Sequence, residues 1–315
     1  MMKRRDFLGL FGAATAAAAF PRSLFAKEKK DFDDNLVAFL SDVHAGVGAK
    51  SGCARDKLKE TVAEILKMDP LPRNVMVFGD IAHLYGLGND YDFSRPVFKL
   101  LEDAGITVTI GMGNHDRRSE FAARWPEAAA KSLVPGRFVH LVETSSVGFL
   151  MLDSLQGTDD RAKDDKGPVP GALSEDEQVF LRDFLEKRQK PVILCAHHMA
   201  SDMKVCGVPL SLLVAKTNHV AGYIHGHNHR WVRDWIRYKD APSPQRPKWV
   251  LGLPSNGLWG DIGYALCRVT SDRAVIEPKL KDFWIPRPVP KEKRPPAWDD
   301  ILAERRASGA CTIHL

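Results

Sequence analysis

The sequence lacks the paired cysteine spacings that mark disulfide frameworks and zinc knuckles. Its cysteines are odd in number and widely separated, at Cys53, Cys195, Cys206, Cys267 and Cys311. A chain without a Cys-x-x-Cys pair is a poor candidate for an iron–sulfur cluster or a thiolate zinc site. The His-Glu-x-x-His motif of zinc peptidases is absent as well, which counts against peptide hydrolysis.

The chain also lacks a strong charge imbalance and an internal linker. Of its net charge of +5, +3 belongs to residues 1–26, and the +2 on the remainder is too little to indicate a nucleic-acid partner. No stretch rich in glycine, serine or proline divides the middle of the chain. We therefore predict one main domain over residues 27–285 and a Pro-rich, charged tail over residues 286–315.

No apolar run reaches the ~20 residues that a membrane-spanning helix needs. The short run Leu10–Phe20 follows the segment Lys3-Arg4-Arg5-Asp6-Phe7-Leu8-Gly9, which resembles the twin-arginine export motif. This resemblance implies a signal peptide over residues 1–26, cut after Ala26 or after Ala19; an N-terminal membrane anchor is the alternative. It further implies the twin-arginine translocase as a partner, a periplasmic or secreted location, and a mature form without a stable membrane span.

Short apolar runs alternate with amphipathic stretches along the rest of the chain. The runs predict buried strands at Leu36–Leu40, Val75–Phe78, Ile106–Ile110, Val147–Leu152, Val192–Cys195 and Val220–Ile224. Helices are predicted at Lys57–Lys67, Arg95–Ala104 and Glu175–Arg188, the last with a capping-box spacing between Ser174 and Glu177. From Trp249 onward the pattern is strand and turn. This alternation predicts an α/β fold with sheets inside and helices outside.

Most of the predicted strands end in residues that can bind a metal ion. The motifs are Ser41-Asp42-Val43-His44, Gly79-Asp80, Gly113-Asn114-His115-Asp116, Ala196-His197-His198 and His225-Gly226-His227-Asn228-His229. In an extended segment, Asp-x-His and His-x-His place both side chains on one side. Loops at the carboxyl ends of strands commonly carry the chemistry of α/β folds. We therefore expect these side chains to converge on one site.

Imidazole and carboxylate ligands suit zinc, iron and manganese. A pair of such ions needs about seven ligands with one carboxylate shared, and it can clamp a phosphoryl group and activate a water molecule. The expected cofactors are therefore two metal ions, Mn, Zn or Fe. For the isolated histidines His140, His219 and His314 we predict ordinary surface or core positions.

These motifs, in this order, resemble those of the calcineurin-like metallophosphoesterase superfamily, from about Leu36 to about Arg268. The stretch from Gly79 to Asp116 is similar to the branch that includes class III cyclic-nucleotide phosphodiesterases and glycerophosphodiesterases. The resemblance implies a four-layer α/β/β/α sandwich of two mixed sheets flanked by helices. It also implies hydrolysis of a small-molecule phosphate mono- or diester by a metal-bound hydroxide. A pyrophosphate-bond hydrolase and a non-catalytic scaffold for protein binding remain as alternatives.

The resemblance implies a role for each residue of these motifs. Metal ligation falls to Asp42, His44 and His229 for the first ion and to Asn114, His197 and His227 for the second, with Asp80 bridging both. His115 would stand beside the leaving group as an acid or electrostatic stabiliser, and Asp116 would orient it.

Some positions depart from the family pattern or flank its motifs. Met199 stands where the fourth motif usually continues with proline, and His83 stands where purple acid phosphatases carry their iron-bound tyrosine. His83 and His198 are candidate substrate contacts, although His198 and His225 could equally fill space beside the ligands. Basic side chains that could meet phosphate, or be ordinary surface charges, lie in two loop-like segments, Leu155–Leu173 and Trp231–Lys248.

Overall fold

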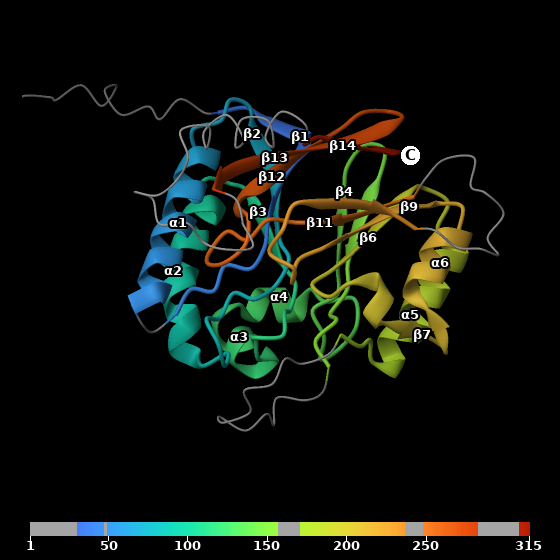
Figure 1. Ribbon diagram of the computed structural model, residues 1–315, viewed down its shortest axis with the longest axis horizontal. Coiled ribbons are helices and arrows are strands. Elements are labelled where there is room, and N and C mark those ends of the chain that lie inside the picture. The colour runs from blue at the N-terminus through green and yellow to red at the C-terminus, as the bar shows by residue number, and fades with distance from the viewer. Residues whose placement is uncertain (1–29, 47–48, 157–170, 237–247, 283–308) are drawn as a thin grey trace, which may run out of the picture. The chain divides into compact units, whose positions relative to one another are not determined.

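Two six-stranded sheets form the centre of the fold in this computed structural model (Figure 1). The structure describes residues 30–46, 49–156, 171–236, 248–282 and 309–315. Residues 31–315 form one unit by their contacts. The predicted signal peptide lies outside the described residues.

The first sheet has the strand order β14-β13-β12-β1-β2-β3. Its parallel half consists of β1 (Phe32–Leu40), β2 (Leu71–Val77) and β3 (Thr107–Ile110). Its antiparallel half consists of β12 (Ile262–Val269), β13 (Arg273–Asp282) and β14 (Cys311–His314). Because β1, β2 and β3 are parallel, their carboxyl ends meet at one edge of the sheet.

The second sheet has the strand order β10-β11-β9-β6-β5-β4. The parallel strands are β5 (Gly148–Met151), β6 (Val192–Ala196), β9 (Val220–His225) and β11 (Trp249–Gly252). Antiparallel strands close its two edges, β4 (His140–Glu143) and β10 (Val232–Trp235). A separate short hairpin pairs β7 (Lys204–Val205) with β8 (Val208–Pro209).

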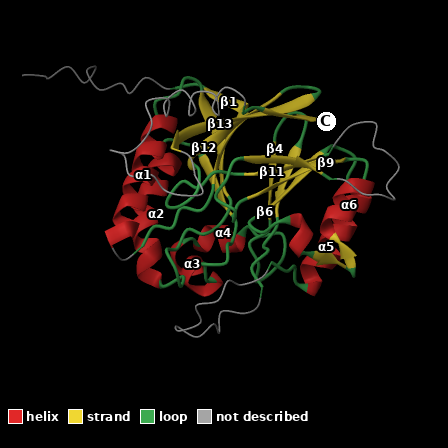
Figure 2. Cartoon of the chain, in the orientation of Figure 1, coloured by secondary structure: helices red, strands yellow, loops and turns green. Residues whose placement is uncertain are grey.

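Helices cover the outer face of each sheet (Figure 2). On the first sheet lie α1 (Ala49–Ile65), α2 (Gly88–Asp103), α3 (Arg118–Arg124) and α4 (Pro126–Ala130), and on the second lie α5 (Glu175–Lys187) and α6 (Leu210–Lys216). A 3-10 turn spans Ala200–Asp202. The capping box predicted for α5 is confirmed, because Ser174 and Glu177 exchange side-chain to backbone hydrogen bonds of 3.3 and 3.2 Å.

Alternation along the strands divides the buried side chains into three layers. On β1, Ala38 and Leu40 pack with the helices of the first sheet, whereas Val37 and Phe39 pack between the two sheets. The third layer lies between the second sheet and the helices α5 and α6. The predicted four-layer α/β/β/α sandwich of two mixed sheets is therefore confirmed, as are the strands predicted at its centre.

The C-terminal boundary of the domain was predicted too early. Residues 286–315 were expected to form a surface tail, but Cys311–His314 is strand β14, paired with β13 at the edge of the first sheet. Cys311 and Ile313 alternate with two polar residues, and both are buried between the sheets. Residues 283–308 lie outside the described part. Among the described residues, no helix has the length and apolar character required to cross a bilayer.

Candidate metal centre

The structure brings all of the predicted metal ligands together at the carboxyl ends of five parallel strands. Asp42 and His44 follow β1, Asp80 follows β2, Asn114 follows β3, His197 follows β6, and His227 and His229 follow β9. Three of these strands belong to the first sheet and two to the second. The site therefore lies where the ends of the two sheets meet, and every ligand comes from a loop that a buried strand holds in place.

One group of donor atoms contains Asp42, His44, Asp80 and His229, whose ligand atoms all lie within 4.8 Å of one another. The Nε2 atom of His229 is 3.1 Å from Asp42 Oδ1 and 3.2 Å from His44 Nε2. The side chains of Asp42, His44 and Asp80 are almost completely buried. This group has the donor set of a metal site with two imidazoles and two carboxylates.

A second group adjoins the first. Asn114 Oδ1 lies 2.9 Å from His197 Nε2 and 2.8 Å from His227 Nδ1. Asp80 Oδ2 stands between the groups, 3.3 Å from His197 Nε2 and 3.7 Å from His44 Nε2. The carboxylate predicted to bridge two ions thus occupies a bridging position in the geometry.

Backbone carbonyls determine which nitrogen of three imidazoles faces the centre. The Nδ1–H groups of His44, His197 and His229 donate to the carbonyls of His83, Phe78 and Leu258 at 3.2, 2.7 and 3.0 Å. Because a carbonyl only accepts, Nδ1 carries a proton, and Nε2 is the nitrogen that faces the centre and can bind a metal ion. The Nε2 atoms of His44 and His229 then face each other at 3.2 Å. Such opposed donors beside buried carboxylates fit a cation, and the carbonyls supply the outer support that metal-bound imidazoles usually have.

The same demand for positive charge appears in the pKa values. Burial lowers the pKa of His44 to about 4, so this ring is neutral and free to bind a metal. Burial also disfavours a charged His197, but the carboxylate of Asp80 outweighs it and raises the pKa of His197 to about 9. Burial by itself would raise the pKa of the Asp42 carboxyl, but the neighbouring His229 lowers it by more, so the pKa is lowered overall. The carboxylates therefore hold a proton on a neighbouring imidazole where a metal ion would otherwise balance them.

Left-handed backbone, and not an extended segment, aims most of these ligands. Asp42, His44, Asp80, His227 and His229 have φ values of 51°, 49°, 49°, 66° and 54°. The sequence prediction that Asp-x-His and His-x-His lie on one side of an extended chain is right about convergence and wrong about its cause. Residues other than glycine reach this region at an energetic cost, and such strain is typical of functional sites.

Two glycines allow the loops after β2 and β3 to approach each other. Gly79 has φ 82°, and a Cβ there would lie 2.5 Å from Gly113 N. A Cβ on Gly113 would lie 2.2 Å from Asp80 Oδ1. Gly79 thus provides a tight turn, whereas Gly113 is required because the Asp80 carboxylate occupies the space of a side chain.

Asp116 does not orient His115 as predicted. Its carboxylate accepts hydrogen bonds from the backbone N–H groups of Ala82 and Gly113 at 3.0 and 2.9 Å, and from Tyr91 Oη at 3.2 Å. It therefore ties the loop after β2 to the loop after β3. The His115 ring is oriented by the Leu84 carbonyl instead, which accepts from Nδ1 at 2.9 Å.

The two candidate substrate contacts occupy different surroundings. His83 lies beside the first group of ligands, with its ring stacked on Trp259. His198 is 1% exposed, its Nδ1 is 2.9 Å from Ser154 Oγ, and its ring lies 5.1 Å from that of His227. Its donor atom is close enough to those of His197 and His227 to form a possible third ligand. His225 is buried, and its Nδ1 lies 2.8 Å from the Gly226 carbonyl.

Sequence reasoning missed the loop between β11 and β12, residues 253–261, which supports the first group. Ser255 Oγ and Gly257 N donate to the carbonyl of Asp42 at 2.9 and 3.0 Å. Leu258 accepts from His229, and Trp259 packs against His44 with ring centroids 5.2 Å apart. The Pro-Ser-Asn-Gly-Leu-Trp-Gly-Asp composition signals a turn, but the sequence contains no pattern that connects it to the distant ligands.

The segments predicted to set specificity lie largely outside the described residues. These are 157–170 within Leu155–Leu173 and 237–247 within Trp231–Lys248. Arg233, which the structure describes on β10, donates to the Ala310 carbonyl at 2.7 Å. It therefore links β10 to the segment that precedes β14.

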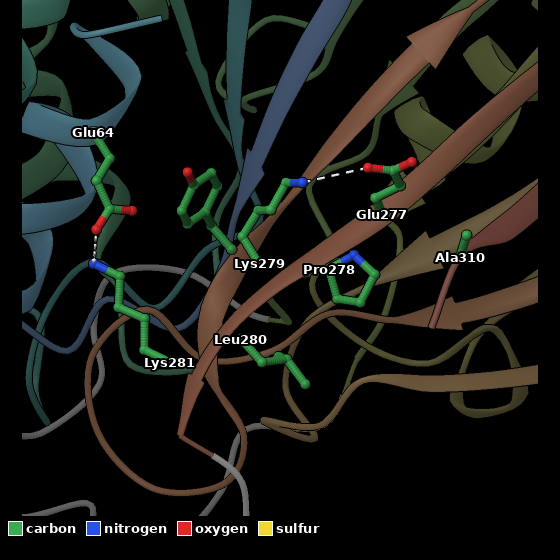
Figure 3. Close-up of a pocket in the computed structure, with 8 residues that line it drawn as sticks. Glu64, Glu277, Pro278, Lys279, Leu280, Lys281 and Ala310 are labelled. Atoms are coloured by element: carbon green, nitrogen blue, oxygen red, sulfur yellow. Dashed lines mark hydrogen bonds and ion pairs between the residues drawn. The ribbon is translucent and has the colours of Figure 1, made fainter. Parts of the chain in front are cut away.

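The pocket drawn in Figure 3 is separate from the metal centre. It has a volume of about 540 Å³ and lies along β13, and its lining includes Glu64 of α1 and Tyr264 of β12. An ion pair of 2.9 Å joins Lys281 to Glu64, and one of 3.3 Å joins Lys279 to Glu277. The described lining contains none of the candidate ligands.

A family model described as calcineurin-like phosphoesterase matches residues 36–231, more than half of the chain. No curated protein sequence matches the chain.

Among solved structures, a dimetal phosphatase from Danio rerio is 15% identical, with a TM-score of 0.56 over 77% of this chain and 95% of that one. The protein TT1561 of Thermus thermophilus is 14% identical, with a TM-score of 0.44 over 74% and 94%. Vps29 of Chaetomium thermophilum is 12% identical, with a TM-score of 0.37 over 89% and 95%. The first of these likenesses supports the fold.

Proposed function

The chain belongs to the calcineurin-like phosphoesterase family, and on that premise we propose that it hydrolyses phosphate esters with the help of two metal ions. The first ion is held by Asp42, His44 and His229, and the second by Asn114, His197 and His227, with Asp80 shared between them. The substrate is a small phosphate mono- or diester. Manganese, zinc and iron all suit this set of nitrogen and oxygen donors.

One observation carries the proposal: nitrogen and oxygen ligand atoms from five strand ends converge in two adjoining groups that share a carboxylate. Asp42 and Asp80 place two negative charges in a region that water hardly reaches. The imidazoles of His44 and His229, and those of His197 and His227, direct ring nitrogens at the same points. Buried charges of one sign require compensation, and two cations at these points provide it.

When bound, the ions supply positive charge to the phosphoryl oxygens and lower the pKa of a water molecule. The chain holds His115 beside them, since its backbone N–H donates to Asp80 Oδ1 at 2.8 Å and its ring donates to Leu84. Its Nε2 lies 3.9 Å from Asp80 Oδ2, and its side chain is 26% exposed. A protonated His115 in this position can donate to the oxygen of a departing group.

Metal analysis combined with a substrate panel tests this function. The purified chain, reconstituted with Mn, Zn or Fe, should bind about two ions and hydrolyse some of a panel of phosphate mono- and diesters. Asp80→Asn should lower metal content and activity together for every substrate, because the amide carries no charge to share between two ions. Asp272→Asn is the matched control, since Asp272 is an exposed carboxylate near β13 that pairs with Arg273. Full metal content and activity in Asp80→Asn would refute the shared-ligand assignment.

The same experiment separates hydrolysis from a scaffold role. A chain that binds both ions but cleaves no mono- or diester, and no pyrophosphate bond, would be a metal-binding scaffold of this fold. Cleavage of pyrophosphate bonds alone would show that the chain is a pyrophosphate-bond hydrolase. The class III phosphodiesterase and glycerophosphodiesterase resemblance makes phosphodiesters the first compounds to assay.

We further propose export through the twin-arginine translocase to the periplasm or beyond. The support is the Arg4-Arg5 segment followed by a short apolar run. Changing Arg4 and Arg5 to lysine should leave folded, metal-loaded protein in the cytoplasm, as measured by cell fractionation and immunoblotting. Equal delivery of the variant and the parent chain would show that the arginine pair is incidental.

A further inference from the structure

Trp259 stands out among the exposed side chains of the described residues. It is 49% exposed and is the one aromatic among the large hydrophobic residues exposed there. It lies in the loop between β11 and β12 and has φ 60°, a conformation that is costly for tryptophan. A strained and exposed aromatic persists only where the surrounding structure holds it in place.

The loop around Trp259 is fixed to the metal centre by its backbone. Asp261 N donates to the His229 carbonyl at 2.7 Å, and Ser255 N donates to the Asp261 carbonyl at 2.9 Å. Gly260 packs so closely that an added Cβ would lie 1.9 Å from the same His229 carbonyl. Trp259 is therefore held next to the first group of ligands on a rigid support.

The Trp259 ring contacts ligands on one side and a second aromatic ring on another. Its centroid is 5.2 Å from that of His44 and 6.0 Å from that of His229. The His83 ring lies 6.2 Å away, with the two planes only 16° from parallel. We call Trp259 and His83 together the aromatic shelf. Leu84, which is 37% exposed, follows His83 and orients the leaving-group histidine, His115.

We propose that the aromatic shelf binds a planar ring carried by the substrate, of which a nucleobase is the commonest biological form. This inference rests on the proposed phosphoesterase function and names its substrate class. When a base stacks on a half-exposed tryptophan, one face of the base and the facing surface of the indole ring are both removed from water. The contact does not require a particular pattern of hydrogen bonds.

A glycerol or other alkyl ester has no flat face to place on this surface. The position of the shelf also suits a ring that belongs to the leaving part of the ester, because the segment His83–Leu84 joins the shelf to His115. Shielding of His44 and His229 from water is the competing role for Trp259. The two roles make different predictions for a change at Trp259. Loss of a base-binding surface weakens the binding of compounds that carry a planar ring, whereas loss of shielding weakens the binding of all phosphate compounds alike.

Paired ligands that differ only in the base provide the test. Adenosine 5′-monophosphate and ribose 5-phosphate are titrated calorimetrically into the metal-loaded chain, and metal content is measured for every variant. The parent chain should bind the nucleotide more tightly. Trp259→Ala should reduce this preference by about 5- to 150-fold, the range of base–aromatic stacking, and Trp259→Phe should retain most of it. Leu133→Ala, another exposed hydrophobic residue, should keep the parent preference.

The outcomes distinguish this inference from the proposed function. Equal affinity of the parent chain for the nucleotide and the sugar phosphate would overturn the shelf. So would an equal loss of both affinities in Trp259→Ala, with or without loss of metal, and Trp259 would then be a support for the metal-binding residues. A preference that depends on Trp259, in a chain that hydrolyses no phosphoester, would uphold the shelf and refute the hydrolase. Hydrolysis with the same kcat/KM for nucleoside and base-free ribosyl esters would uphold the hydrolase and refute the shelf.

Discussion

Replacing Gly257 with alanine should disturb the first group of ligands while most of the fold stays intact. A Cβ at this position would lie 1.9 Å from the carbonyl oxygen of Val43, 2.6 Å from its carbonyl carbon and 3.0 Å from the Asp42 carbonyl oxygen. All of these atoms belong to the backbone between two predicted ligands. No flexible side chain can move aside to relieve the clash.

The size of the effect follows from these distances. To reach an acceptable carbon–oxygen contact, the Val43 carbonyl and the loop must separate by about 1 Å, and overpacking of this kind costs about 1–3 kcal/mol of folding stability. The separation should break the 3.0 Å hydrogen bond from Gly257 N to the Asp42 carbonyl. A shift of ~1 Å in catalytic geometry can cost about 10²-fold in rate. We expect kcat/KM to fall by about that factor.

Metal stoichiometry, thermal unfolding and phosphoesterase kinetics measure the consequences of Gly257→Ala. Metal content should fall from about two ions to about one, because this loop hydrogen-bonds to Asp42 and His229, both of which are assigned to the first ion. Gly136→Ala is the control for lost stability: its φ of 72° strains an alanine too, but no atom lies within 4 Å of an added Cβ there, so it should cost folding stability and leave metal content and kcat/KM unchanged. Parental metal content and kcat/KM in Gly257→Ala would refute the positioning role of the loop.

Two further predictions concern other parts of the molecule. His115→Ala should retain its metals and lose more activity on alkyl phosphoesters than on p-nitrophenyl esters, because a good leaving group needs little help from an acid. Expressed as free energies, the losses of kcat/KM on the two substrates should differ by about 1–3 kcal/mol. Equal losses with intact metals would assign His115 to phosphoryl binding. Burial, and then the charge of Asp153, raises the pKa of Glu177 from 4.5 to about 7, so folding stability should fall as pH rises across that interval, because the unfolded chain releases its proton first. Between about pH 5 and about pH 8, the free energy of unfolding measured in urea should decrease by up to about 3 kcal/mol less in Glu177→Gln than in the parent chain. The same decrease in both chains would contradict the raised pKa.

The metal centre was predictable to the extent that its chemistry lies in short motifs. Asp42-Val43-His44 and His227-Asn228-His229 are recognisable because the ligand types and their positions after apolar runs are properties of the sequence. The same holds for the α/β alternation, since burial of strands requires apolar runs and surface helices require amphipathic ones. These local requirements also predicted the capping box at Ser174.

Long-range contacts decided the remaining features. The family resemblance implied that Asp116 orients His115, yet its carboxylate accepts hydrogen bonds from the N–H groups of Ala82 and Gly113 and so joins two strand ends. The loop with Ser255, Gly257 and Trp259 reads only as a turn, because its role depends on atoms about two hundred residues away. Strand β14 was taken for a tail, since a four-residue strand at a sheet edge becomes visible only when its partner β13 is placed.

The sequence by itself therefore determined which side chains can bind metal and which apolar runs become the central strands. Those properties follow from residue chemistry and local periodicity. Tertiary structure alone decided the left-handed turns that aim Asp42 and His44, the carbonyls that orient the imidazoles, and the loop that holds Trp259 beside them. Such features depend on close packing between segments that are far apart in the chain, and packing of that kind leaves no periodic trace in the sequence.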